Sequence, residues 1–389
     1  MKSDDNHNEI TRYEGEFARW FDADAGFAFW KGRVALYAIL KAMGLGPGDE
    51  VIVPGYTCVM DVNPIKYLGA RPVYVDIEPD TFNINTDLLW DSITSKTRVI
   101  IAQHTYGYPC DMDAIAEIAR KNDISVIEDC CLAFGSKYRG KTVGTFGKAA
   151  YFSFQWNKPY TTGLGGIAIT SDAELSDRIK SLRAGEMCPP SKKEVIMLGA
   201  QLLVYRLLVY PRTTALAQNV FRYLTKRGAV VGSSSTAEFE PVKADDFFKG
   251  LSTLQARSGL RQLSRVEKNI AHRRKMARLY DQLLQQKGWH GRKYDSDLMD
   301  PVLVRYPVRI VEKDKALAGA AKAGIELGSW FECPLHPSET PLSSYGYEAG
   351  MCPEAERASR EAVNLPLHPR ANERTVRRSV DFISRFMEV

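Results

Sequence analysis

Apolar residues between positions 32 and 170 alternate between short continuous runs and runs with helical spacing. The short runs, typical of buried strands, occupy residues 50–53, 71–77, 97–103, 124–129, 149–154 and 167–170. Apolar positions three and four residues apart, typical of amphipathic helices, occupy residues 33–43 and 112–121. Strands that alternate with helices form parallel sheets covered on both faces. The pattern therefore predicts an α/β fold with a mostly parallel sheet flanked by helices.

The pattern changes beyond residue 171. One long amphipathic helix is predicted over residues 251–286, a strand over 301–311, and helices over 314–323 and 354–363. A chain of 389 residues is long enough for a large and a small domain. We therefore predict a large domain over residues 1–245 and a smaller C-terminal α/β domain over residues 246–389.

An apolar and basic helical insertion interrupts the large domain over about residues 188–243. Its apolar block, residues 195–210, contains Arg206 and is shorter than the roughly 18–20 residues that cross a bilayer. Two interpretations remain open. A helix that is apolar on all sides is most often buried, here against the body of the protein or a second subunit. Alternatively, the neighbouring basic residues favour peripheral contact of residues 195–227 with a membrane surface.

Net charge and cysteine content indicate which partners and which kinds of site to expect. The net charge is +5 at pH 7 and no dense run of Lys or Arg occurs, which argues against a nucleic-acid partner and favours a small anionic substrate. The 7 cysteines form no C-x-x-C pair, which predicts free thiols and no metal site. The N-terminal residues are polar, so we expect no export signal and a cytoplasmic location.

Two candidate chemical groups, Lys158 and Asp129, each follow a predicted strand. The carboxyl ends of neighbouring parallel strands meet at one edge of a sheet, where ligands bind. Taken alone, the lysine has the simpler interpretation of a solvated loop residue, and the aspartate that of a helix cap. Together they are the pair that pyridoxal phosphate needs: an amine for a Schiff base and a carboxylate that keeps the pyridine nitrogen protonated.

Further residues nearby match the remaining needs of such a site. Gly32 begins a predicted helix, whose first N–H groups favour an anion, and Arg33 could add a charged contact to phosphate. Ser153 stands five residues before the lysine and could offer its hydroxyl. A loop after the strand at 50–53 carries Tyr56 and Cys58, either of which could cover the face of the pyridine ring.

A set of motifs in fixed order gives these residues a family context. They are residues 44–54, 69–76, 104–113, Glu128-Asp129, residues 144–147, Phe152-Ser-Phe-x-x-x-Lys158, Leu254-Gln-Ala256, Pro334-Leu-His336 and residues 364–369. In this order and at these spacings the chain resembles the DegT/DnrJ-type sugar aminotransferases. These are pyridoxal-phosphate enzymes of fold type I, in the aspartate aminotransferase superfamily. The resemblance is dense from 32 to 170 and resumes in the C-terminal part.

The resemblance implies a role for individual residues. Lys158 would attach the cofactor and Asp129 would pair with the pyridine nitrogen. Ser153 and the helix start at Gly32-Arg33 would contact the phosphate. The remaining assignments are Thr57 and Cys58 over the ring, His104 as a catalytic residue near cofactor or substrate, and Tyr56 and His336 as substrate contacts. No metal is implied, and the family places its sites between the two subunits of a homodimer.

The activity implied is transfer of an amino group from an amino acid, with glutamate as the expected donor, to a nucleotide-linked keto-sugar. Such reactions serve polysaccharide or glycoconjugate biosynthesis. Several positions depart from the commoner family pattern, namely Lys31, Arg33, Cys58, Leu132, Leu164 and a missing Asn-x-Arg near residues 247–250. They leave two alternatives, a pyridoxal-phosphate sugar dehydratase or lyase, and a non-catalytic regulatory member. Related dehydratases carry histidine at the lysine position, so Lys158 argues against the first.

Overall fold

A seven-stranded sheet forms the centre of the protein in the computed structural model, which describes residues 2–156, 158–208, 236–289, 291 and 293–387. The order is β1-β10-β9-β6-β5-β2-β4. The strands are β1 (Ala25–Phe29), β2 (Glu50–Pro54), β4 (Arg71–Val75), β5 (Thr97–Gln103), β6 (Ser125–Asp129), β9 (Ala149–Ser153) and β10 (Gly166–Thr170). Only β10 runs antiparallel to its neighbours in this sheet, β1 and β9. The predicted mostly parallel sheet is confirmed.

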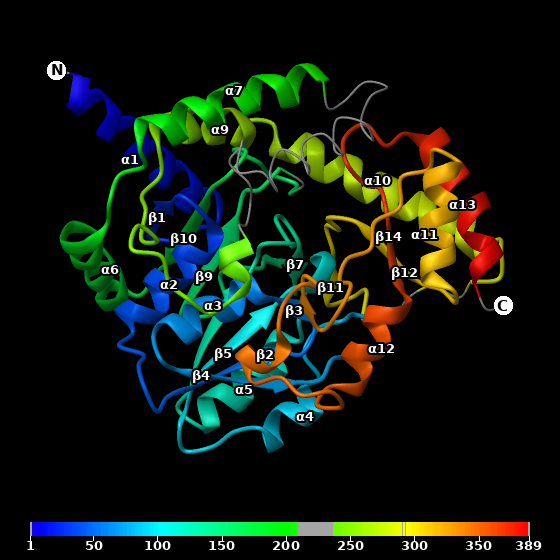
Figure 1. Ribbon diagram of the computed structural model, residues 1–389, viewed down its shortest axis with the longest axis horizontal. Coiled ribbons are helices and arrows are strands. Elements are labelled where there is room, and N and C mark those ends of the chain that lie inside the picture. The colour runs from blue at the N-terminus through cyan, green and yellow to red at the C-terminus, as the bar shows by residue number, and fades with distance from the viewer. Residues whose placement is uncertain (1, 157, 209–235, 290, 292, 388–389) are drawn as a thin grey trace.

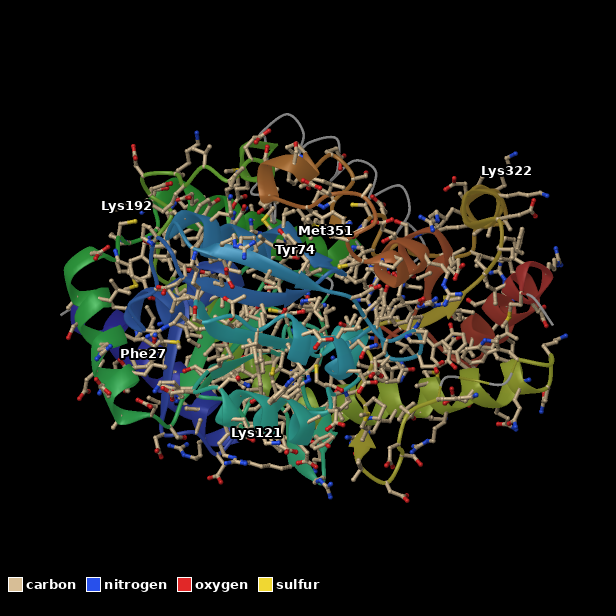
Figure 2. The ribbon with its side chains drawn as sticks, turned by 90° about the horizontal axis from the view of Figure 1, so that it is seen from below. Phe27, Tyr74, Lys121, Lys192, Lys322 and Met351 are labelled. Atoms are coloured by element: carbon tan, nitrogen blue, oxygen red, sulfur yellow. The ribbon has the colours of Figure 1, made fainter. Side chains whose placement is uncertain are left out.

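Helices cover both faces of this sheet because alternate strand residues point to opposite sides. In β2, Val51 and Val53 pack in the core beneath α2 and α6, whereas Ile52 packs in the core that α1 and α5 cover. The helices are α1 (Lys2–Trp20), α2 (Gly32–Ala42), α3 (Val59–Tyr67), α4 (Thr86–Asp91), α5 (Met112–Lys121) and α6 (Ala173–Glu186). Short strands complete this part: β3 (Thr57–Cys58), β7 (Lys137–Tyr138), β8 (Lys141–Thr142) and β11 (Met299–Asp300). Figure 2 shows side chains filling the layers, with Lys121, Lys192 and Lys322 directed outward.

A smaller α/β part lies at one end of the molecule (Figure 1). It contains α10 (Val266–Gln285), β12 (Tyr306–Arg309), α11 (Lys313–Lys322), β13 (Leu335–His336), α12 (Pro353–Glu361), β14 (Ala362–Leu365) and α13 (Glu373–Ile383). Strands β12 and β14 pair antiparallel over a separate hydrophobic core. The helix predicted at 354–363 ends at Glu361, because the chain enters β14 at the next residue.

The structure has two helices where one long helix was predicted over residues 251–286, so this prediction was wrong. Ser252 caps α9 (Thr253–Leu263), which ends before Ser264, and α10 begins two residues later. Helix α9 packs against α1 of the large part, whereas α10 packs against α13 of the small part. We therefore propose that the boundary between the domains follows α9, near residue 264, in place of residue 245.

The insertion begins with α7 (Lys192–Leu208), which lies beside α9 in Figure 1. Leu198 and Leu202 are buried in a cluster with Trp30, Trp156 and Leu164. The opposite side exposes apolar side chains, Ile196 at 72%, Leu203 at 59% and Val204 at 51%. The basic stretch at 213–227 lies outside the described residues. Among the described helices, none is long and apolar enough to cross a membrane.

The start of β10 and the start of α2 approach each other backbone to backbone. A Cβ atom added to Gly166 would lie 2.5 Å from the backbone nitrogen of Gly32. Real side chains do not tolerate such a contact with backbone, so only glycine fits here. This close approach fixes the first turn of α2 against the edge of the sheet.

We predict that Gly166→Ala lowers the free energy of unfolding by about 1–3 kcal/mol, because the new methyl group overpacks this contact. The measurement is urea unfolding followed by circular dichroism. Gly185→Ala is the matched control, since a Cβ at Gly185 in α6 meets nothing within 4 Å. Alanine is the better helix former, so the control should be neutral or slightly stabilised. Equal losses in both variants would contradict the packing argument.

Candidate active site

The candidate site lies at the carboxyl edge of the parallel strands, where several polar side chains meet. Asp129 ends β6, Ser153 ends β9 and Gln103 ends β5. In the sheet register, Asp129 lies opposite Gln103 on one side and Tyr151 on the other. Lys158 follows β9 after one turn, and its backbone N–H donates to the Gln155 carbonyl. The strand ends thus bring the predicted amine and carboxylate to the same edge.

Gly32 and Ser153, both predicted phosphate contacts, are adjacent. A Cβ atom on Gly32 would lie 2.7 Å from the Cβ atom of Ser153. Helix α2 begins at Gly32 without a side-chain cap and without an acidic residue in its first turn. The start of α2 therefore lies beside Ser153, and a helix N-terminus with a serine hydroxyl nearby suits a phosphate group.

Arg33, a predicted phosphate contact, has a carboxylate partner within the chain. Its Nη1 atom lies 2.7 Å from Oε1 of Glu238, and the side chain is only 3% exposed. Lys31 Nζ lies 3.2 Å from the same oxygen. Burial lowers the pKa of Lys31 to about 8, and the positive charge of Arg33 adds to this effect against the opposing charge of Glu238. The structure thus shows a contact of Arg33 with Glu238, and the phosphate contact of Arg33 stays a prediction.

Glu238 is a site residue that the sequence pattern did not reveal. It lies in η2 (Thr236–Phe239), directly after the part of the insertion that is outside the described residues. Its backbone carbonyl accepts a hydrogen bond from the Asn63 side chain at 2.8 Å, which fixes η2 against α3. The contact joins Arg33 to a residue 205 positions away. No local spacing could have indicated it.

Lys158 faces the small part of the molecule. Its Nζ atom lies 5.5 Å from the centre of the Trp330 ring, and the guanidinium of Arg305 lies 4.6 Å from that centre. Cations over an aromatic face are attracted by the ring's electron density. The lysine therefore stands between the edge of the sheet and the loop before β13, so that both parts of the chain form the site.

His336 also reaches this region from the small part. In β13 it pairs with Cys58 of β3, in a parallel two-stranded ladder. Its ring centre lies 5.3 Å from that of Phe331. Burial lowers the pKa of His336 to about 4, and the charge of Lys158 contributes in the same direction. The imidazole is therefore neutral near pH 7 and close enough to Lys158 to be affected by its charge, and its contact with substrate stays a prediction.

Thr57 and Cys58 form a rigid edge of the site. The Thr57 hydroxyl donates to the Gln103 side chain at 2.5 Å, and Gln103 in turn donates to the Tyr56 carbonyl at 3.0 Å. Burial raises the pKa of the Cys58 thiol to about 12, and the nearby charge of Asp61 raises it further. Cys58 is thus a neutral, half-buried thiol held by a strand pairing, which suits a small group lying over a ring.

Tyr56 does not contact the open side of the site, which corrects its assignment as a substrate residue. The side chain is completely buried, and its ring stacks on Phe82 with centres 5.5 Å apart. Its hydroxyl accepts from the Phe331 N–H and lies 2.9 Å from the Tyr106 hydroxyl. An aromatic residue with its hydroxyl satisfied in this way is part of the hydrophobic core, which here includes residues of the small part.

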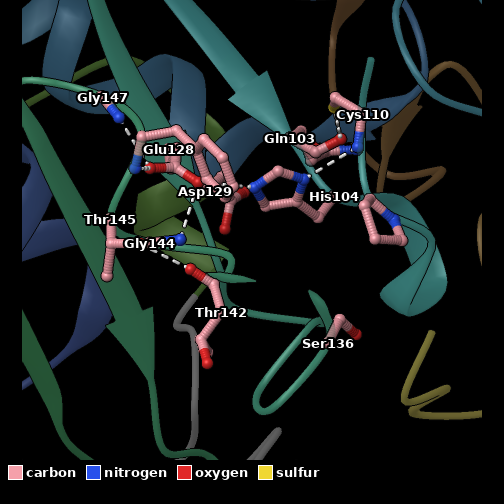
Figure 3. Close-up of polar contacts among 12 residues, drawn as sticks. Gln103, His104, Cys110, Glu128, Asp129, Ser136, Thr142, Gly144, Thr145 and Gly147 are labelled. Carbon is pink, nitrogen blue, oxygen red and sulfur yellow. Dashed lines mark hydrogen bonds and ion pairs between the residues drawn. The ribbon is translucent and has the colours of Figure 1, made fainter. Parts of the chain in front are cut away.

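His104 is completely buried with both ring nitrogens engaged (Figure 3). The Cys110 N–H donates to Nδ1 at 3.0 Å, so Nε2 carries the proton and donates to Glu128 at 3.1 Å. The backbone N–H of His104 donates to the carbonyl of Asp129 at 3.1 Å. The geometry does not support the predicted catalytic contact, and we propose that His104 positions the end of β6.

Glu128 completes this support beneath Asp129. Its carboxylate accepts backbone N–H groups from Gly144 at 2.6 Å, Phe146 at 2.6 Å and Gly147 at 2.8 Å. His104, Glu128 and Cys130 are close enough to resemble a metal-ligand cluster. Because the Glu128 oxygens are occupied by backbone donors, we assign the cluster to support of the turn at residues 144–147.

Asp61 is a second site residue that was missed. It lies in the first turn of α3, and its Oδ1 atom accepts a hydrogen bond from the Tyr151 hydroxyl at 3.0 Å. Its charge interacts with those of Asp129 and Lys158. The helical spacing from Cys58 could have indicated that Asp61 faces the same side, but no residue pattern indicated a second carboxyl group.

The set of groups at this edge fits pyridoxal phosphate. The site offers an amine at Lys158, a carboxylate at Asp129, and a glycine-lined helix start beside the Ser153 hydroxyl. The position of a Cβ atom on Gly32 is already taken up by Ser153, so glycine allows the start of α2 to lie directly against the end of β9. Bound there, the cofactor would find a partner for its aldehyde, its ring nitrogen and its phosphate.

Comparisons with known proteins agree with this arrangement. The model of the DegT/DnrJ/EryC1/StrS aminotransferase family matches residues 4–202 and 247–384. GDP-perosamine synthase of Caulobacter vibrioides is 32% identical over 379 residues, covering 95% of this chain and 88% of that protein. GDP-perosamine synthase of Escherichia coli O157:H7 is 46% identical over 171 residues, which span 44% of this chain and 47% of that protein.

A solved structure of S. venezuelae DesV in complex with a ketimine intermediate has the same fold. It superposes with a TM-score of 0.74 at 26% identity, covering 97% of this chain and 88% of the other. The family model does not match residues 203–246 of this chain. These residues include most of the insertion and the segment that carries Glu238. The contact of Glu238 with Arg33 is therefore made by a part of the chain that the family model does not match.

We predict that Glu128→Gln lowers the free energy of unfolding by about 2–3 kcal/mol, because an amide N–H₂ would replace one of the oxygens that accept backbone N–H groups. Urea unfolding measures the change. Glu117→Gln is the control, since Glu117 forms an exposed pair with Lys121 on α5. Loss of such a pair changes stability by less than about 1 kcal/mol. Similar losses in both variants would show that Glu128 is not a supporting residue.

Proposed function

The chain belongs to the DegT/DnrJ/EryC1/StrS aminotransferase family, and we propose that it transfers an amino group from an amino acid to the ketone of a nucleotide-linked sugar. The observation that carries this proposal is the meeting of Lys158 and Asp129 at one sheet edge, beside the helix start at Gly32. Glutamate is the proposed donor. A GDP-linked keto-sugar is the proposed acceptor, because two similar relatives are GDP-perosamine synthases.

We propose the following roles for the residues of the site. When bound, pyridoxal phosphate supplies an electron-withdrawing ring that stabilises negative charge at the carbon bearing the amine. Asp129 holds the proton on the ring nitrogen, and Cys131 N–H orients it by donating to Oδ1 at 2.8 Å. The α2 N-terminus and Ser153 hold the phosphate.

Lys158 is the proposed proton carrier. Its Nζ atom takes the proton from the α-carbon of the amino donor, and in the second half of the reaction it returns a proton to the carbon that receives the amine. Trp330 flanks this amine and excludes water from one side of it. His336, neutral near pH 7, is the proposed hydrogen-bonding partner of the sugar.

We propose that the protein is a homodimer acting in the cytoplasm. The exposed apolar side of α7, with Ile196, Leu203 and Val204, supports a contact with a second copy. A membrane surface is the alternative that the same side chains support. We expect a dimer by analytical ultracentrifugation and no flotation with anionic liposomes. A monomer that floats with the vesicles would favour the membrane alternative.

We predict that the purified protein shows a visible absorbance band from lysine-bound pyridoxal phosphate, and that Lys158→Ala abolishes the band together with activity. Lys121→Ala is the control, since this exposed lysine lies on α5, where it pairs with Glu117. It should keep both the band and the activity. A wild type that takes up no pyridoxal phosphate would contradict the cofactor assignment.

We expect that glutamate removes the visible band and yields 2-oxoglutarate, and that a GDP-linked keto-sugar then restores it. Product formation is measured by mass spectrometry, as an amino-sugar nucleotide. Restoration of the band by a UDP-linked sugar alone would leave the aminotransferase assignment intact and overturn the choice of GDP. Failure of every keto-sugar, with glutamate still converted, would favour a regulatory member.

A further inference from the structure

The segment that carries Trp330, residues 328–331 before β13, is bonded to Asn364 through both its main chain and its side chain. Asn364 lies in β14 and is buried. Its backbone N–H donates to the Gly328 carbonyl at 2.9 Å, and its backbone carbonyl accepts the Gly328 N–H at 2.8 Å. Its side chain does the same for Trp330: Oδ1 accepts the Trp330 N–H at 3.0 Å, and Nδ2 donates to the Trp330 carbonyl at 3.0 Å. One asparagine thus fixes two residues of the segment.

A buried ammonium group holds the residues on either side of Trp330. Lys313 begins α11, and its Nζ atom donates to three backbone carbonyls. Two of them belong to the segment, those of Ser329 at 3.2 Å and Phe331 at 3.3 Å, and the third is that of Ser359 in α12 at 2.7 Å. Hydrogen bonds from a charged donor are stronger than those between neutral groups. Lys313 therefore binds the segment firmly to α12.

Two tyrosines of the large part hold the same segment. The Tyr106 hydroxyl donates to the Trp330 carbonyl, and the Tyr56 hydroxyl accepts the Phe331 N–H at 2.9 Å. The Trp330 carbonyl therefore accepts from both Asn364 and Tyr106, and its N–H is bonded as well. Buried side chains thus satisfy both backbone groups of Trp330, which fixes the direction in which its side chain leaves the main chain.

The residue fixed in this way is only half-buried, and its ring faces the amine of the site. Lys158 Nζ lies 5.5 Å from the centre of the Trp330 ring, and the guanidinium of Arg305 lies 4.6 Å from it. A cation and an aromatic face attract each other, so ring and amine hold one another in place. Because the ring stays partly open while its backbone is bonded on every side, these bonds do not serve to bury the ring. They determine where it stands relative to Lys158.

We propose that Asn364 and Lys313 are positioning residues, which keep the Trp330 ring against the amine of Lys158. The inference rests on the proposed function, which makes this amine the proton carrier. A proton moves efficiently only when the amine points at the carbon concerned, and a displacement of about 1 Å costs about 100-fold in rate. The ring limits the directions open to the amine on one side, so release of the segment lets the amine leave this position. The motif at residues 364–369 thereby gains a role for its first residue.

The first measurement treats the full-length, cofactor-free protein briefly with acetic anhydride, which acetylates accessible amines. Mass spectrometry gives the acetylation of Lys158 relative to that of Lys121, an exposed lysine that serves as internal reference. Asn364→Leu, close in volume and unable to form hydrogen bonds, should raise this ratio severalfold, because the ring no longer covers the amine. Asn372→Leu is the control, since it removes the cap of α13 and lowers stability away from the site. It should keep the wild-type ratio. An unchanged ratio in Asn364→Leu would overturn the inference.

The second measurement mixes the cofactor-loaded protein with glutamate and follows the loss of the visible band. Asn364→Leu should lower the rate constant at saturating glutamate by about 10–100-fold and leave the half-saturating concentration unchanged, because it disturbs proton transfer and not the binding of glutamate. Trp330→Leu completes a double-mutant cycle. Because Asn364 acts through Trp330, the double variant should be no slower than Trp330→Leu alone. Losses that multiply would show that Asn364 acts by another route.

Lys313→Met supplies an independent variant, since it keeps an unbranched side chain and removes both bonds to the segment. It should raise the acetylation ratio of Lys158 and show the same lack of additivity with Trp330→Leu. Should Asn364→Leu not fold, Lys313→Met decides, and wild-type values in it would overturn the inference. A wild type that does not react with glutamate contradicts the proposed function instead, while the acetylation ratio still tests whether the ring is held against the amine.

Discussion

The buried carboxylate of Glu128 is the interaction on which the geometry of the site depends. It lies one residue before Asp129, so every bond that fixes Glu128 also fixes the strand end that carries the ring-binding carboxylate. Three backbone N–H groups of the turn at 144–147 and the ring of His104 converge on it. A charge buried without partners costs several kcal/mol, so this carboxylate forces the turn, the histidine and β6 into one arrangement.

The site as a whole is a balance between buried charges of both signs. Lys31, Arg33 and Lys158 face the carboxyl groups of Asp61, Asp129 and Glu238 within one region. Placed in a low-dielectric interior, each group changes the protonation of its neighbours. The protonation state of each side chain therefore depends on the others, so replacing one of them changes the pKa of its neighbours.

The sequence predicted six of the seven strands of the central sheet, because each of these contains a short apolar run that is largely buried, whereas β1 was not predicted. Helix α5 at 112–121 was also predicted to the residue, since Asp111 provides its cap. The division between α9 and α10 was missed because Ser264 and Arg265 interrupt an amphipathic pattern only locally. Lys158, Asp129, Ser153 and Gly32 were predicted from strand ends and spacing, which the fold converts directly into proximity.

What the sequence could not predict was the contact between distant segments. Tyr56 is held by a hydrogen bond from Phe331, 275 positions away. The carboxyl group of Asp61 is held by a tyrosine 90 positions away. Glu238 meets Arg33 across 205 positions. Periodicity reports which face of an element is buried. It carries no information on which polar side chain from elsewhere will be its neighbour.

The contact between Glu238 and Arg33 places a carboxylate of the chain itself at the first turn of α2, next to the proposed phosphate position. The carboxylate of Glu238 is an internal anion, tethered by the hydrogen bond from Asn63 and always present at high effective concentration. An external anion that bound Arg33 in place of Glu238 would break this ion pair, and its measured affinity would be the difference between the two interactions. Such an exchange would also remove the salt bridge that links η2 to the first turn of α2.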